Sequence, residues 1–211
     1  KKFFDPLKQR NHLVLLPKNK EGLKSLFRIV SDSYKDGFYR YPRVDFDLLR
    51  KNANNNLIAT SACLAGRMSA IVAMNQTRDF QGSYNPDSLK DNYEVIQKEL
   101  AKLVGMFQEV LGEENYYLEI QFNKLPLQHI INYHLIECSK RTGAKLVVTC
   151  DSHYARPEYW KEREIYKAMI WAGKSKGSLS ADALPQKIEE LKCELYPKNA
   201  EQVWDSYLAY G

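Results

Sequence analysis

Hydrophobic and polar positions along the 211-residue chain recur with two spacings, one typical of helices and one typical of strands. Helical spacing is clearest over Tyr93 to Leu111, and it also predicts helices over residues 19–34, 46–52, 126–143 and 157–173. Apolar or alternating runs predict strands over residues 12–16, 57–60, 116–122 and 145–150. Strands that alternate with helices predict a parallel α/β architecture, either open or closed into a barrel.

The first predicted helix has a distinct apolar stripe, and Asn19 is placed to cap its start. The stripe consists of Leu23, Leu26, Phe27, Val30 and Tyr34. At the other end of the chain, residues 174–180 are rich in Gly, Ser and Lys and resemble a linker. Beyond them, residues 184–195 and 200–207 are plausible helices outside the main layer.

Composition narrows the class of protein only modestly. The net charge of +5 is compatible with a polyanionic partner, but the basic residues are dispersed among acidic ones. Four scattered cysteines without paired spacing predict a reduced, cytoplasmic protein, and no run approaches the roughly 18 apolar residues of a membrane helix. The phosphate-loop, dinucleotide-binding, nucleophile-elbow and paired-cysteine zinc motifs are all absent from the sequence.

The strongest candidate for chemistry is the end of the predicted strand at residues 145–150. Asp151 and His153 follow it directly, and residues two apart in extended chain point the same way. A carboxylate and an imidazole together suit a divalent cation such as zinc or manganese. The same residues also fit a capping Asp and a His packed at a turn. Cys150 alternates away from this pair, which argues against it as a ligand.

Four further residues are open to more than one interpretation. Cys63 follows the strand at residues 57–60 in a turn of small residues, where it is either a metal ligand or a small core thiol. His12 begins a strand, a position where a His is more often structural. Glu119 and Gln121 share one face of a strand, which either lines a barrel interior or forms a solvated edge.

Four ordered stretches resemble a known family. They are residues 11–22 (NHLVLLPKNKEG), 34–45 (from YKDGFY to PRVD), 57–66 (LIATSACLAG) and 146–154 (LVVTCDSHY). In this order they are similar to the PHP (polymerase and histidinol phosphatase) domain of bacterial DNA polymerase III alpha subunits. Residues 195–204 (LYPKNAEQVW) resemble the segment that follows that domain.

The resemblance implies a fold and a site. The fold is a distorted (β/α)7 barrel of PHP type, incomplete at its N-terminus, with a helical C-terminal extension. The expected domains are residues 1–173, the later two thirds of the barrel, and residues 174–211, a linker and the start of the polymerase body. The implied metal ligands are His12, Cys63, Asp151 and His153, of which Asp151 and His153 are also the expected catalytic residues. The implied cofactors are divalent zinc, manganese or magnesium ions.

The implied function is the PHP part of a DNA-directed DNA polymerase in DNA replication, with a metal-dependent 3′–5′ exonuclease or phosphoesterase site. The expected partners are DNA, the rest of the polymerase chain and the replisome subunits, with no membrane. Two alternatives are a stand-alone PHP phosphoesterase and a catalytically inactive structural module of the polymerase. The N-terminal His-x-His ligands of the family are not in this sequence, so we expect a fragment that is inactive by itself.

Overall fold

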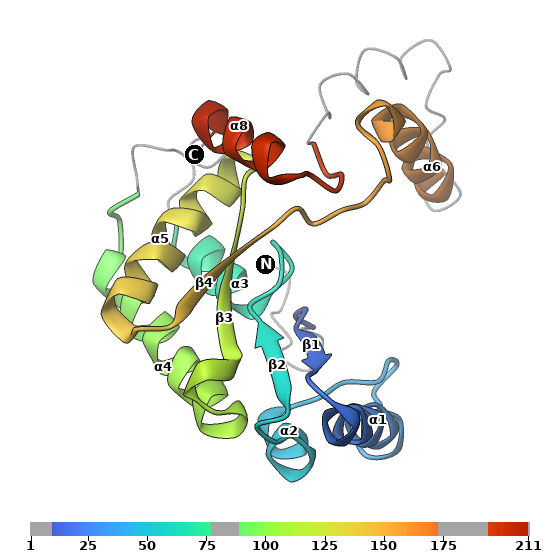
Figure 1. The fold of residues 1–211 in the computed structure, drawn as a ribbon, viewed down its shortest axis with the longest axis vertical. Coiled ribbons are helices and arrows are strands. Elements are labelled where there is room, and N and C mark those ends of the chain that lie inside the picture. Colours follow the sequence, from blue (N-terminus) through green and yellow to red (C-terminus); the bar gives the residue numbers. More distant parts are fainter. Residues whose placement is uncertain (1–9, 77–88, 173–193, 211) are drawn as a thin grey trace, which may run out of the picture. The chain divides into compact units, whose positions relative to one another are not determined.

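The computed structural model describes residues 10–76, 89–172 and 194–210, which form a mixed α/β structure (Figure 1). The chain divides into two compact units. Unit 1 comprises Lys1–Ile120 and Ile130–Val148, and unit 2 comprises Gln121–His129 and Thr149–Gly211. The expected domain boundary at residue 173, the linker at residues 174–180 and most of the helix at residues 184–195 lie outside the described residues. The boundary therefore stays a prediction.

The secondary structure follows the predicted pattern closely. The strands are β1 (Val14–Pro17), β2 (Leu57–Thr60), β3 (Tyr116–Gln121) and β4 (Lys145–Thr149). The helices are α1 (Lys20–Lys35), α2 (Phe46–Asn52), α3 (Arg67–Asn75), α4 (Tyr93–Leu111), α5 (Pro126–Thr142), α6 (Trp160–Ala172) and α8 (Ala200–Tyr210), with short 3-10 turns η3 (Glu113–Asn115) and η4 (Pro157–Tyr159). Helix α3 is the one described helix that the apolar spacing does not predict. None of the described helices has the length and apolarity needed to cross a bilayer.

The four strands form one sheet in the order β1-β2-β3-β4 (Figure 1). Strands β2 and β3 are parallel, but β1 and β2 are antiparallel, so the expectation of a wholly parallel sheet is wrong for this pair. The course of the chain between β1 and β2 accounts for the antiparallel pairing. The Lys18 amide donates to the Asn56 carbonyl at 2.8 Å, which shows that the chain re-enters the sheet at the end where β1 leaves it. Closure into a seven-stranded barrel stays a prediction.

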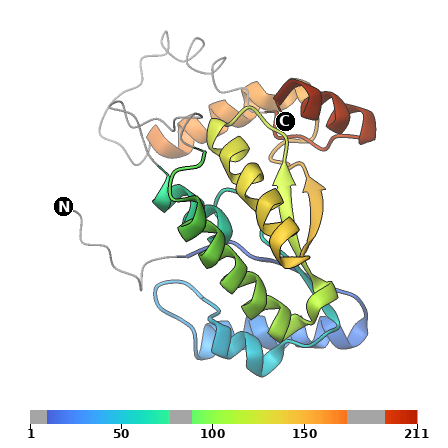
Figure 2. The same cartoon turned by 90° about the vertical axis from the view of Figure 1, so that its left-hand side faces the viewer.

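The core of unit 1 lies between the sheet and helices α4 and α5, which lie side by side in Figure 2. Helix α4 buries one complete face, as its apolar spacing predicts. The Phe107 ring stacks on Tyr116 of β3 with centroids 4.4 Å apart, and it also meets Phe46 of α2 at 4.9 Å. Aromatic packing therefore connects α2 and α4 to strand β3.

Helix α1 is oriented in a way that its sequence does not suggest. An apolar stripe ordinarily faces the core, yet Phe27 and Tyr34 are 61% and 62% exposed, and Leu23 and Val30 are exposed with them. The buried face carries Gly22, Ser25, Ile29 and Ser33 instead.

Close backbone contact explains this orientation of α1. A Cβ at Gly22 would lie 2.2 Å from the Asn56 carbonyl oxygen, so only glycine permits this approach. The Asn54 side chain adds a hydrogen bond of 2.8 Å to the Ser25 hydroxyl. Asn19 caps the helix as predicted, because its side chain accepts from the backbone amides of Glu21 and Gly22.

Candidate metal-binding residues

In unit 1 a tight turn after β2 brings Cys63 close to His12. The His12 amide donates to the Ala65 carbonyl at 2.9 Å, and the Gly66 amide donates to the Cys63 carbonyl at 2.8 Å. Gly66 is required here, because a Cβ would lie 2.2 Å from the Ser61 carbonyl oxygen. As a result Cys63 Sγ lies 3.7 Å from His12 Nδ1, although the two residues are 51 positions apart. Cys63 is half-buried and forms no disulfide, so it is not the buried core thiol that was the alternative.

In unit 2 the second candidate pair follows β4. Asp151 Oδ2 lies 3.4 Å from His153 Nε2, as expected for residues two apart. Asp151 has a φ of 44°, a left-handed conformation that Asp tolerates better than most residues. Ala62, next to Cys63, has a φ of 59°. Unusual backbone geometry is therefore found beside both pairs, and such geometry tends to occur at functional sites.

The donor distances in both pairs are compatible with shared metal ligation. Around a tetrahedral zinc ion, ligand bonds of about 2.0–2.3 Å place a sulfur and a nitrogen about 3.5 Å apart, and an oxygen and a nitrogen about 3.3 Å apart. The observed distances are 3.7 Å for Cys63 and His12 and 3.4 Å for Asp151 and His153. The described residues contain no group of three or more His, Cys, Asp or Glu side chains arranged to hold a metal ion. By donor type and separation alone, each pair matches two neighbouring ligands of a divalent cation.

Glu119 belongs to a buried polar cluster between β2 and β3. Its side chain is only 7% exposed and accepts a hydrogen bond from the Thr60 hydroxyl, and its amide donates to the Ser61 hydroxyl at 2.8 Å. Gln121 is also buried. The solvated-edge alternative for these two residues is therefore wrong. The alternation along the strand identified their shared face, but sequence alone could not show which face was covered.

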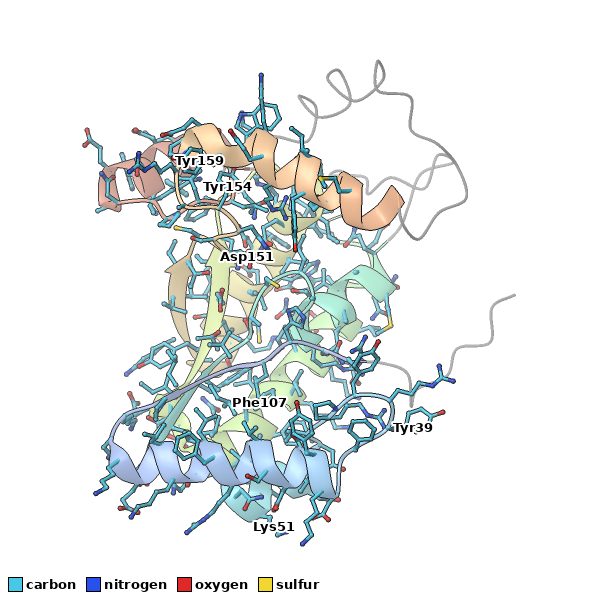
Figure 3. All side chains as sticks on the ribbon, turned by 90° about the vertical axis from the view of Figure 1, so that its right-hand side faces the viewer. Tyr39, Lys51, Phe107, Asp151, Tyr154 and Tyr159 are labelled. Atoms are coloured by element: carbon cyan, nitrogen blue, oxygen red, sulfur yellow. The ribbon has the colours of Figure 1, made fainter. Side chains whose placement is uncertain are left out.

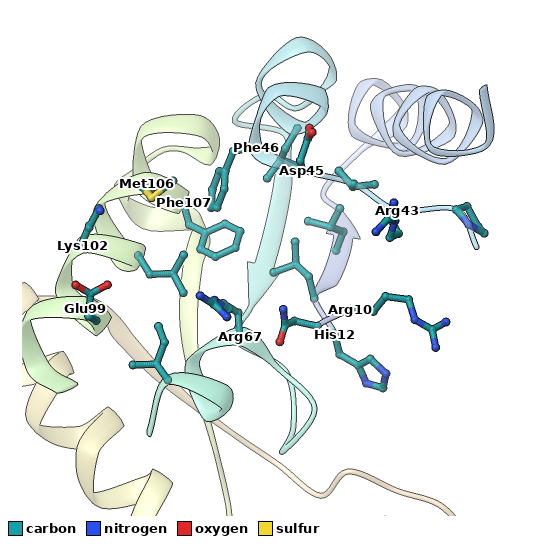
Figure 4. Close-up of a pocket in the computed structure, with 18 residues that line it drawn as sticks. Arg10, His12, Arg43, Asp45, Phe46, Arg67, Glu99, Lys102, Met106 and Phe107 are labelled. Atoms are coloured by element: carbon teal, nitrogen blue, oxygen red, sulfur yellow. The ribbon is translucent and has the colours of Figure 1, made fainter. Parts of the chain in front are cut away.

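A cavity of about 600 Å³ in unit 1 opens beside His12 (Figure 4). Its basic lining residues are Arg10, Arg43, Arg67 and Lys102. Two of these cations lie against aromatic rings, since the Arg10 guanidinium is 3.9 Å from the centre of the Tyr41 ring and that of Arg43 is 5.0 Å from the centre of Tyr39. These two arginines line the cavity, but the rings that they lie against do not belong to its lining.

Two further contacts in the region of Asp151 and His153 have no signal in the sequence. The His153 amide donates to the Leu195 carbonyl at 2.8 Å, and the Leu195 amide donates to the Tyr154 hydroxyl at 2.9 Å. Tyr154 and Asp151 are both labelled in Figure 3. Leu195 is more than 40 residues from its partners, and such a long-range contact cannot be inferred from local spacing.

Comparison with known proteins identifies the family. The model of the PHP domain matches residues 3–123, so the chain belongs to the PHP-domain family. It is similar to the DNA polymerase III subunit alpha of several bacteria. The identity is 34% over 72% of this chain for Aquifex aeolicus, 36% over 77% for Chlamydia trachomatis, and 31% over 93% for Borreliella burgdorferi. The chain spans only 11%, 13% and 16% of these relatives, respectively.

Proposed function

We propose that this chain is the PHP region of a replicative DNA polymerase and that it carries a metal-dependent phosphoesterase site. Membership of the PHP family and similarity to three polymerase subunits along 72–93% of the chain support the first part. The proposed cofactor is zinc, manganese or magnesium. The proposed partners are DNA, the remainder of a polymerase chain and other replisome subunits.

The observation that carries the proposed site is the pairing of donor atoms. His12 with Cys63, and Asp151 with His153, have the separations expected of neighbouring ligands on a divalent ion. In each pair, an imidazole nitrogen beside a thiolate sulfur or a carboxylate oxygen favours zinc over magnesium, because magnesium prefers oxygen ligands alone. These four residues are the proposed metal ligands.

The proposed reaction is hydrolysis of the terminal phosphodiester at a DNA 3′ end, which releases a nucleoside monophosphate. A divalent ion held by these residues would polarise the phosphoryl oxygen and lower the pKa of a bound water toward about 7. Asp151 and His153 would supply a carboxylate oxygen and an imidazole nitrogen to that ion. The other carboxylate oxygen of Asp151 would accept a proton from the attacking water, while the 3′ oxygen of the penultimate nucleotide would leave and take a proton from solvent. These two residues are therefore the proposed catalytic pair.

Cobalt(II) titration of the chain tests the proposed ligands. We expect a near-ultraviolet sulfur-to-cobalt charge-transfer band that Cys63→Ser removes, and cobalt affinity at least about tenfold weaker in Asp151→Asn. Cys150→Ser is the matched control, because Cys150 is likewise half-buried and forms no disulfide but is not a proposed ligand. A band that persists in Cys63→Ser would show that this ligand assignment is wrong.

A structural module of the polymerase is the second candidate. The exposed apolar stripe of α1 favours it, because a large exposed apolar patch commonly marks an interaction surface. Absence of cobalt binding in the unsubstituted chain, and also in the longer polymerase that contains it, would support this alternative over the phosphoesterase.

A further inference from the structure

The segment Glu194–Lys198 of unit 2 lies directly against the loop that carries Asp151 and His153. The amides of His153 and Tyr154 both donate to the Leu195 carbonyl, at 2.8 and 3.3 Å. In the opposite direction, the Leu195 amide donates to the Tyr154 hydroxyl at 2.9 Å. Leu195 is 5% exposed, so water competes little for these bonds. Three hydrogen bonds thus join the segment to the loop at a single residue.

The segment is itself firmly anchored within unit 2. The Lys198 ammonium donates to the Phe122 carbonyl at 3.0 Å and to the Ser206 hydroxyl at 2.6 Å, and its side chain is only 3% exposed. Glu194 pairs with Lys124 at 3.3 Å and with Lys198 at 3.5 Å. Removing the partners of a buried cation is strongly destabilising, so these contacts hold the segment in a defined position.

The loop needs such support because it follows the end of β4 and belongs to no helix or strand. Asp151 and His153 are both partly exposed, and their donor atoms must stay about 3.4 Å apart to share an ion. Supporting contacts that fix the orientation of metal ligands often determine metal affinity. The hydrogen bonds of Leu195 act on the backbone of His153 and of the residue that follows it.

We propose that Tyr154 and Leu195 are positioning residues, which hold His153 in the orientation that metal ligation requires. The inference rests on the proposed function for its metal, but it concerns a contact that exists without one. It assigns a role in the site to a segment that lies after the loop in the chain and supplies no ligand itself. It also means that α8, which follows the segment, is connected to the site by the Lys198 anchor.

Tyr154→Phe is the variant that tests the inference, because it removes only the hydroxyl that accepts from Leu195. The ring, which lies 6.0 Å from Tyr196, is retained. We expect the Leu195 and His153 amides to exchange with solvent about fivefold faster, and cobalt to bind about fivefold more weakly, both typical of one lost hydrogen bond. Tyr159→Phe is the matched control, since Tyr159 is an exposed tyrosine nearby in the chain. We expect it to leave both quantities unchanged.

A measurement on the metal-free chain separates this inference from the proposed function. The order parameter of the His153 side chain, from ¹³C relaxation, should fall in Tyr154→Phe and stay unchanged in Tyr159→Phe. If it falls but the unsubstituted chain binds no cobalt, the proposed function fails and the positioning role stands. If it does not change, or if the unsubstituted chain binds cobalt and Tyr154→Phe binds it equally tightly, the positioning role is overturned.

Discussion

The buried histidine His134 should make the chain sensitive to mild acid. It lies on α5 with no exposed surface, and burial lowers the pKa of its imidazole to about 4. The Gln97 amide donates to the His134 carbonyl at 3.0 Å and lies 3.4 Å from the ring nitrogen Nδ1. Glu137, on the same helix, and a backbone hydrogen bond with Leu89 act in the opposite direction and favour the protonated ring, but burial outweighs them.

The size of the effect follows from the two pKa values. Above about pH 6.5, the ordinary value, His134 is neutral in both the folded and the unfolded chain. Below it, the unfolded chain binds a proton that the folded chain does not, so the free energy of unfolding falls by about 1.4 kcal/mol per pH unit. Between pH 6.5 and about pH 4 the loss reaches about 3 kcal/mol, of which about 2 kcal/mol is lost by pH 5.

Urea unfolding followed by circular dichroism at pH 7, 6 and 5 measures this loss. We expect His134→Gln to be less stable than the unsubstituted chain at pH 7 but to lose less stability toward pH 5. Gln97→Met is the control, because it removes a partner but keeps the imidazole and should therefore keep the steep pH dependence. Equal pH dependence in His134→Gln and in the unsubstituted chain would refute the reasoning.

Three further predictions concern the fold. Asn19→Ala should cost about 1 kcal/mol of unfolding free energy, because the cap of α1 is lost; an unchanged urea midpoint would show that the cap contributes nothing. Gly22→Ala should cost about 1–3 kcal/mol despite the better helix propensity of Ala, since the new Cβ would meet the Asn56 carbonyl at 2.2 Å. A more stable Gly22→Ala variant, measured in the same way, would contradict that close contact. Leu118→Ala, at a fully buried position of β3, should lower the free energy of unfolding by about 2–5 kcal/mol, and a loss below about 1 kcal/mol would mean that the site repacks.

The sequence predicted the helices and strands better than it predicted which residues contact one another across them. Helix α4 was predictable because one apolar stripe coincides with its buried face. Helix α3 was not, because apolar residues occur all around it and its N-cap, Gly66, has no capping side chain. The approach of Cys63 to His12 came from a family resemblance, since no periodicity relates residues 51 positions apart. The contact of Leu195 with His153 had no signal at all, because backbone hydrogen bonds of this kind do not depend on side-chain type.

The orientation of α1 has a consequence for how variants of this chain should be ranked. Scales that score a substitution by the hydrophobicity it removes would place Phe27 and Tyr34 among the sensitive positions and Gly22 and Ser25 among the tolerant ones. The burial of these residues supports the reverse order for folding of the chain, because the small residues form the contact and the aromatic ones face solvent. In a saturation screen scored by folded yield, almost no substitution of Gly22 should therefore be tolerated. Polar substitutions of Phe27 should be tolerated.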